Sequence, residues 1–188
     1  MVLSVISSPT KAFESAFHNP RLGISLIVVL LAAAFFALAS FLVFSDALLA
    51  AYFFIASLIQ WLVFSVLVWF FEFVHVRKRS QLTGTNFFQI ASVTSKLWTL
   101  NLASSILLAV IAFLLPRISE PLLTVVFAIV VICAVVLLAG WIVGSIKMLK
   151  VVTGASRARL FVNWLILIII NSVIVSFITL LLTRAVPF

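Results

Sequence analysis

Residues 24–44 of the chain read ISLIVVLLAAAFFALASFLVF, and residues 47–74 read ALLAAYFFIASLIQWLVFSVLVWFFEFV. Each stretch is as long as the roughly 20 apolar residues that a helix needs to cross a bilayer. One helix through both stretches would be far longer than a bilayer is thick. Serine and aspartate are favoured N-cap residues, so we expect Ser45 and Asp46 to form a tight turn that starts a second helix.

Three further apolar stretches follow, at 97–115, 122–146 and 160–182. Pro116 ends the third stretch, and Ser119-Glu120-Pro121 is typical of the start of another helix. The sequence therefore predicts an all-α integral membrane bundle of five transmembrane helices. This membrane domain would span residues 23–188, after a cytosolic interfacial arm at residues 1–22.

Composition supports a membrane protein. Hydrophobic residues make up 66% of the chain and charged residues only 9%, whereas soluble domains carry about 25% charged residues. The net charge is +8, but the basic residues form short runs between apolar stretches. This arrangement indicates contact with anionic lipid headgroups and not with nucleic acid. The single cysteine, Cys133, excludes an intrachain disulfide.

The basic residues also predict the orientation of the chain. Short loops that are rich in lysine and arginine stay in the cytosol. An N-terminus inside and a C-terminus outside would place only Arg117 and Arg184 on the outer side. The other ten of the chain's twelve lysines and arginines would lie on the cytosolic side, namely Lys11, Arg21, Arg77, Lys78, Arg79, Lys96, Lys147, Lys150, Arg157 and Arg159.

Seven of these residues are candidates for contact with anionic lipid. Arg157 and Arg159 are expected in the first turn of the last helix, where the helix dipole disfavours positive charge. Either a lipid phosphate or plain solvation by water could compensate for the positive charge of these two arginines. The candidates are Arg77, Lys78, Arg79, Lys147, Lys150, Arg157 and Arg159.

The cytosolic connections carry further local signals. Ser8 and Pro9 suit the start of a helix in the arm, and Asn19-Pro20 suits its end. Its apolar face could lie flat in the headgroup region or pack under the bundle. That face consists of Ala12, Phe13, Ala16 and Phe17. In the second connection we expect a short helix after Asn86 that leads into the third span. In the fourth connection Gly154 should break the chain, and Ser156 should cap the last helix.

Several segments resemble a known family. The opening SSPTKAFESAFHNPRLGISLIVVLLAAAF (7–35), the mid-chain GTNFFQ (84–89) and LKVVTGASRARLFVNWLILII (149–169) resemble prokaryotic Yip1-domain proteins. The resemblance covers nearly the whole chain, and it implies a multi-pass protein of the cell membrane, in a prokaryote, that organises membranes. Eukaryotic members act in vesicle traffic and engage prenylated GTPases through a longer N-terminal domain. The short arm and the lack of their D-L-Y-G-P sequence give no expectation of GTPase binding here.

The sequence lacks the motifs of common enzymes. It has no P-loop, no G-x-G-x-x-G, no G-x-S-x-G and no H-E-x-x-H. Glu72 and His75 share a helix face, as in a di-metal bundle, but the chain has too few further carboxylates. We expect an ion pair with the neighbouring Arg77, Lys78 or Arg79 in preference to a metal. The sequence thus predicts a non-enzymatic protein without cofactor or metal.

Polar residues within the apolar stretches leave two functions open. They could hydrogen-bond neighbouring helices, or they could line a path for a polar solute or a lipid headgroup. We expect the first, and expect the following side chains to face inward: Asn101, Ser104, Asn171, Ser172 and Ser176. Gly140 and Gly144 form a G-x-x-x-G motif for close packing against another helix of this chain or of a second copy.

The sequence as a whole predicts a membrane-organising or trafficking adaptor. The alternative is a passive conduit, such as a lipid scramblase or a subunit of a small-solute channel or transporter. Expected partners are membrane lipids, with anionic headgroups on the cytosolic face, and a protein partner or a second copy of the chain.

Overall fold

A computed structural model describes residues 5, 7–76, 86–118 and 120–185. These residues form helices and no strand. In chain order they are α2 (Pro9–His18), α3 (Leu22–Phe44), α4 (Ala47–Val76), α5 (Phe87–Leu114), the 3₁₀ turn η2 (Leu115–Arg117), α6 (Glu120–Thr153) and α7 (Arg157–Ala185). Within the described ranges, five helices are long and apolar enough to cross a membrane. This finding confirms the five expected segments.

The turn between α3 and α4 has the predicted capping. Ser45 adopts the left-handed conformation with φ 55°, and its N–H donates to the carbonyl of Phe41 at 2.8 Å. The Oδ1 atom of Asp46 accepts the N–H of Leu48 at 2.8 Å and that of Leu49 at 3.1 Å. These bonds satisfy backbone groups that the two helix ends leave free. Two residues therefore suffice to reverse the chain.

The third span differs from its predicted boundaries. We expected a short helix before a span at 97–115, but α5 runs without a break from Phe87. A capping box opens it, in which Asn86 Oδ1 accepts the N–H of Phe88 and Gln89 Oε1 accepts that of Asn86. Hydroxyl groups further along α5 donate to carbonyls of the same helix. For example, Thr99 Oγ1 donates to the carbonyl of Lys96 at 2.7 Å. The polar stretch before residue 97 is thereby accommodated inside one helix. Beyond Leu114, Pro116 lies in η2, so the helix ends where expected.

The last two helices also extend beyond the predicted spans. α6 continues past residue 146 to Thr153 because Met148, Leu149 and Val152 on this turn are buried. Gly154 then adopts a positive φ of 59°, which breaks the chain as predicted. α7 begins at Arg157, one residue after Ser156, whose carbonyl accepts the N–H of Leu160 at 2.8 Å.

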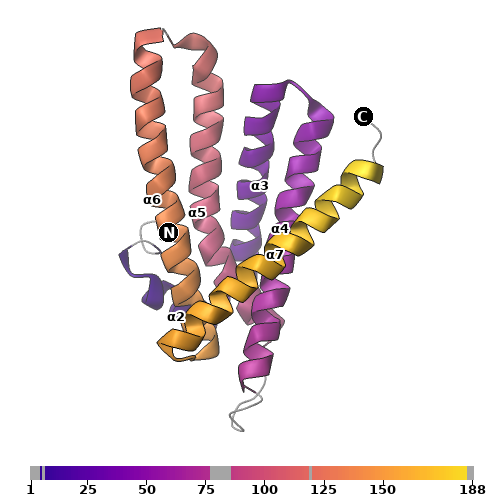
Figure 1. The fold of residues 1–188 in the computed structure, drawn as a ribbon, viewed down its shortest axis with the longest axis vertical. Coiled ribbons are helices and arrows are strands. Elements are labelled where there is room, and N and C mark those ends of the chain that lie inside the picture. The colour runs from indigo at the N-terminus through magenta and orange to yellow at the C-terminus, as the bar shows by residue number, and fades with distance from the viewer. Residues whose placement is uncertain (1–4, 6, 77–85, 119, 186–188) are drawn as a thin grey trace.

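The helices form two pairs that α7 crosses (Figure 1). α3 packs against α4 on one side and α5 on the other, and α5 also packs against α6. α7 runs diagonally across the front of Figure 1 and contacts α4 and α6. At the lower end, α2 packs against α5 and α6. We call this the α2 end and the other the opposite end.

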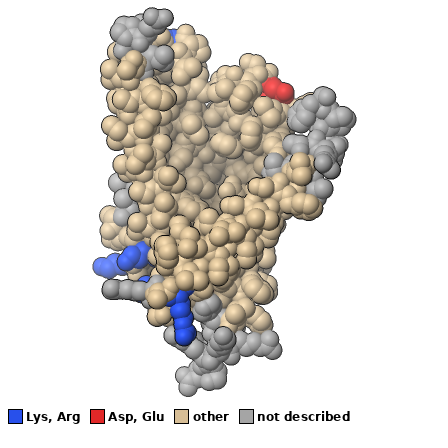
Figure 2. Space-filling model, viewed as in Figure 1, with Lys and Arg blue, Asp and Glu red and all other residues tan. Residues whose placement is uncertain are grey.

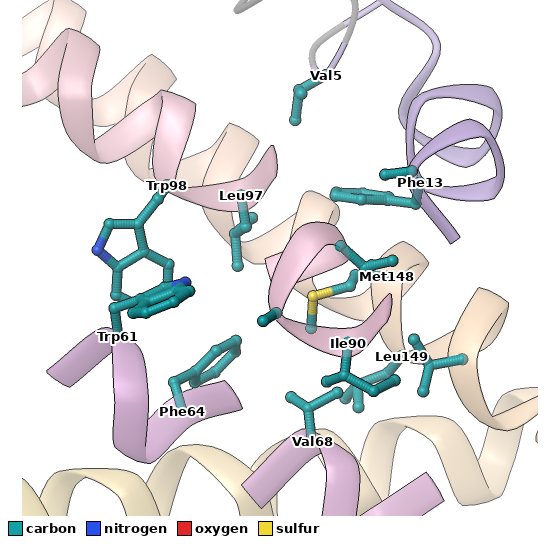
Figure 3. Close-up of a cluster of buried hydrophobic side chains, with 14 of the residues drawn as sticks. Val5, Phe13, Trp61, Phe64, Val68, Ile90, Leu97, Trp98, Met148 and Leu149 are labelled. Atoms are coloured by element: carbon teal, nitrogen blue, oxygen red, sulfur yellow. The ribbon is translucent and has the colours of Figure 1, made fainter. Parts of the chain in front are cut away.

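The core is concentrated toward the α2 end. Phe13 and Ala16 of α2 are buried, and Phe13 shares one buried cluster with Leu97, Met148 and Leu149 (Figure 3). Two residues of the expected apolar face of the arm helix, Phe13 and Ala16, are therefore buried where α2 packs against α5 and α6. Farther along, the ring of Phe64 on α4 lies 5.6 Å from that of Trp98 and 6.1 Å from that of Trp141.

Large apolar side chains also cover the outside of the molecule. On α6, a helix of high hydropathy, Phe127 is 68% exposed and Ile132 is 63% exposed. Apolar surface of this extent is unfavourable in water and is typical of a surface that faces lipid or another protein. The fold is therefore that of a helical multi-pass membrane protein.

Candidate functional site

Basic side chains gather at the α2 end. On the face drawn in Figure 2, most of the lysine and arginine surface lies toward this end. Of the candidate lipid contacts, Lys150 and Arg159 are exposed and Lys147 is half-buried. The side chain of Arg157 and the whole of residues 77–79 lie outside the described residues. We refer to Lys147, Lys150 and Arg159 as the basic belt.

The basic belt occupies the junction between α6 and α7. Lys150 is in the last turn of α6, where the negative end of the helix dipole favours a cation. Arg159 is in the first turn of α7, where the positive end disfavours one. An anion at this junction would relieve that cost, so a headgroup near Arg159 has an electrostatic reason to bind.

A second basic feature is a cavity of about 940 Å³ between α2, α3 and α5. We call it the basic cavity. Ser15 and His18 of α2, Arg21 ahead of α3, Ser25 of α3, and Ser92 and Lys96 of α5 line it. The backbone N–H of Arg21 donates to Ser92 Oγ at 3.3 Å, and Ser25 Oγ donates to the same atom at 3.3 Å. These bonds join the start of α3 to α5 at the wall of the cavity.

No pattern in the sequence predicts this cavity. Lys96 and Arg21 bear only on the predicted orientation, and His18, Ser15 and Ser92 belong to no motif. Ser92 is 71 residues from Arg21, so no local spacing could reveal their contact. The signal in the sequence is that Arg21 and Lys96 each stand just before an apolar stretch, at 24–44 and 97–115.

The middle of the bundle holds two smaller cavities, of about 290 and 380 Å³. Gln60, Asn101 and Ser104 line both, so these polar side chains lie between the two spaces. Figure 2 shows that this face is hollowed between the α5–α6 pair and the helices α3, α4 and α7. Asn101 and Ser104 are half-buried and form part of the wall of both cavities.

The polar residues of α7 do not all face inward as the sequence predicts. Asn171 is buried, but Ser172 and Ser176 are exposed. The expectation that both serines face inward is wrong, because the residues of α7 that face the bundle at this level are the buried Asn171 and the cavity-lining Val175. The Oδ1 atom of Asn171 is buried without a hydrogen-bond partner among the described residues, as is Nε1 of Trp61 on α4.

Other hydroxyls are used for packing. Ser65 on α4 and Thr94 on α5 share a hydrogen bond of 2.7 Å, and both side chains are buried. Trp164 Nε1 on α7 donates to Ser145 Oγ on α6 at 2.7 Å. Bonds of this kind hold membrane helices together at about 0.6 kcal/mol each.

The G-x-x-x-G motif makes one close contact within the chain. A Cβ atom on Gly144 would lie 2.9 Å from Cδ1 of Leu97 on α5 and 3.9 Å from Cζ of Phe13. Gly140, one turn away, is half-buried. The helix that approaches Gly144 is therefore α5 of the same chain.

Glu72, the other charged candidate, is only 3% exposed. The side chain of His75 and residues 77–79 lie outside the described part of the chain, so the expected ion pair stays a prediction. Within the described part, no three histidine, cysteine, aspartate or glutamate side chains are close enough to share a metal ion.

Fold and site define a helical multi-pass membrane protein with a basic end. Comparison of the chain with protein-family models, with curated proteins and with solved structures found no match. The resemblance to Yip1-domain proteins therefore stays a prediction.

Proposed function

We propose that the protein is a non-enzymatic membrane organiser that gathers anionic lipids at its α2 end, as the resemblance to Yip1-domain proteins implies. The observation that carries the proposal is the position of the basic residues. Lys11, Arg21, Lys96 and the basic belt all belong to elements that meet at the α2 end, whereas Arg117 lies at the opposite end. Each basic residue near an anionic membrane surface contributes about 1 kcal/mol of attraction.

The same distribution supports an orientation. Loops rich in lysine and arginine remain in the cytosol, so we propose that the α2 end is cytosolic and that the chain ends outside. The inner leaflet supplies the anionic lipids that such a surface attracts. A prokaryotic plasma membrane is the proposed location.

The polar contacts favour an organiser over a conduit. Ser65 and Thr94 bond to each other, and Ser145 accepts from Trp164, so these side chains hold helices together. Ser172 and Ser176 are exposed and do not extend the group formed by Asn101 and Ser104. A polar route through all five predicted residues is therefore interrupted at α7.

The proposal is tested by neutralising the basic belt. The variant Lys147→Gln, Lys150→Gln, Arg159→Gln should retain less anionic phospholipid per protein after purification in mild detergent. Phosphorus analysis and lipid mass spectrometry measure this amount. Arg117→Gln, at the opposite end, is the control and should retain the amount bound by the wild type. If the belt variant retains as much anionic phospholipid as the wild type, the charges of the belt serve orientation alone and the proposed function fails.

A second candidate function is a passive conduit for lipid headgroups. It is favoured by the two cavities that meet at Gln60, Asn101 and Ser104. It is also favoured by the Oδ1 atom of the buried Asn171, which has no hydrogen-bond partner in the described part of the chain. Leaving a buried acceptor without a partner costs about 1–3 kcal/mol, a cost that a passing polar group could offset. Val175, one turn after Asn171, lines the larger of the two cavities.

Liposomes distinguish the two functions. As an organiser, the purified protein should neither scramble fluorescent lipid nor release small solutes above the level of empty vesicles. Flux that depends on the protein and disappears in Asn101→Leu, Asn171→Leu, in a variant of normal thermal stability, would establish the conduit. Ser172→Leu, an exposed position on α7, serves as the matched control.

A further inference from the structure

We propose that the basic cavity between α2, α3 and α5 binds a single phosphate group, carried by a phospholipid headgroup or by a soluble phosphate ester. The inference deepens the proposed function, on which it rests for the position of the α2 end at the cytosolic surface. It differs from the basic belt in location, because the belt lies at the α6–α7 junction.

The first reason is uncompensated positive charge. Arg21 and Lys96 both line the cavity, and their charges are close enough to repel each other. Lys96 is half-buried, so water screens it less than a surface lysine. None of the acidic residues that the structure describes lines the cavity. An anion between the two cations would replace this repulsion by two attractions.

The second reason is a set of hydrogen-bond donors. Ser92 Oγ accepts from the N–H of Arg21 and from Ser25 Oγ, so its own proton is available for a third acceptor. His18 adds a ring nitrogen, and Ser15 adds a hydroxyl. Phosphate oxygens are strong acceptors, and their hydrogen bonds to cationic donors are stronger than bonds between neutral groups.

The third reason is the start of α3 beside the cavity. Among the residues that the structure describes, no side chain caps this helix at Arg21, and the first N–H groups of a helix lack intrahelical partners. Ile24 and Ser25 of this first turn line the cavity. The positive end of the helix dipole adds to the field of Arg21 and Lys96 and favours an anion.

The fourth reason is membrane depth. Arg21 and Lys96 stand just before the apolar stretches that begin at Ile24 and Leu97. The boundary of an apolar stretch corresponds to the level at which the polar headgroups begin. His18, Asn19 and Arg21 line the cavity and are exposed, so it is reachable from outside. A lipid phosphate in the cytosolic leaflet would thus meet the cavity at its own depth.

The test measures thermal stabilisation of the purified full chain in detergent by three probes. Phosphatidylglycerol carries the phosphate on a lipid, inorganic phosphate carries it in solution, and diacylglycerol has lipid tails without phosphate. The cavity variant is Arg21→Gln, Lys96→Gln. The matched control is Arg117→Gln, Arg184→Gln, which removes the same charge from elements at the opposite end, outside both the cavity and the belt. Arg21→Gln alone keeps the test valid if the double variant does not fold, because Arg21 is exposed.

We expect phosphatidylglycerol to stabilise the wild type and the control, and diacylglycerol to have no effect. In the cavity variant the apparent affinity for phosphatidylglycerol should fall at least about tenfold, the effect of one lost hydrogen bond to a charged group. Arg21→Lys, Lys96→Arg should keep most of the binding. Equal stabilisation by inorganic phosphate, lost in the same variant, would support the cavity and identify a soluble phosphate ester as its source.

Two results would overturn the inference. One is no stabilisation of the wild type by either phosphatidylglycerol or inorganic phosphate. The other is an equal loss of affinity in the cavity variant and the control, since binding would then follow net charge alone. Native mass spectrometry separates the cavity proposal from the basic-belt proposal. We expect the cavity to hold the last lipid that is removed, and the basic belt to hold the larger number of lipids that are removed first.

Discussion

Gly144 on α6 and Leu97 on α5 approach so closely that a Cβ atom added to the glycine would lie 2.9 Å from Cδ1 of the leucine. The leucine end is flexible, so a methyl group could be accommodated by a small rotation. A larger side chain could not, because Leu100 and Phe13 lie at 3.9 Å on the same side. Glycine here sets the distance between the two helices.

Gly144→Leu should therefore destabilise the bundle. Overpacking a tight core costs about 1–3 kcal/mol, and thermal unfolding in detergent measures the loss. Gly140→Leu is the control at a half-buried position one turn away and should cost less. An unchanged melting temperature for Gly144→Leu would mean that α5 and α6 separate more easily than this contact indicates.

The bond between Trp164 and Ser145 should stabilise the position of α7. Trp164 Nε1 donates to Ser145 Oγ at 2.7 Å, and this hydroxyl donates to the carbonyl of Ile142 at 2.9 Å. A double-mutant cycle with Trp164→Phe and Ser145→Ala should give a coupling of about 0.6 kcal/mol, the average for such bonds in membranes. Additive effects of the two substitutions would show that the bond contributes nothing.

Asp46 should contribute to stability as an N-cap. Its Oδ1 accepts two N–H groups at the start of α4. Replacing a capping aspartate by alanine costs about 1 kcal/mol, so Asp46→Ala should lower the melting temperature. Asp46→Asn keeps the acceptor oxygen and should retain most of the stability. If both variants melt alike and below the wild type, the charge of Asp46 is the cause, and the cap is not.

The orientation can be tested with single cysteines in a Cys133→Ser background. Ala47→Cys lies at the opposite end and Ser156→Cys at the α2 end, and both residues are exposed. A thiol reagent that cannot cross the membrane should label Ala47→Cys in intact cells. Ser156→Cys should react only after the cells are opened, because the basic end stays inside. Labelling of Ser156→Cys in intact cells would show that the α2 end faces outward, opposite to the proposed orientation.

The sequence by itself determined the number of long apolar helices and most of their ends. The turn at Ser45 and Asp46, the stop at Pro116 and the break at Gly154 all lie where the residues indicated. These features are local: the length of an apolar run, a capping oxygen or a glycine acts within a few residues. Such signals survive in the folded molecule because the backbone must satisfy its own hydrogen bonds inside a membrane.

Only the tertiary structure decided which faces of the helices are buried. A soluble helix shows its buried face as an apolar stripe, but here residues such as Phe127 and Ile132 are apolar and exposed, so no stripe distinguishes core from lipid. For that reason the outward position of Ser172 and Ser176 was not foreseen. The basic cavity likewise exists only because packing brings Ser92 to Arg21, a contact between residues far apart in the sequence that no local pattern encodes.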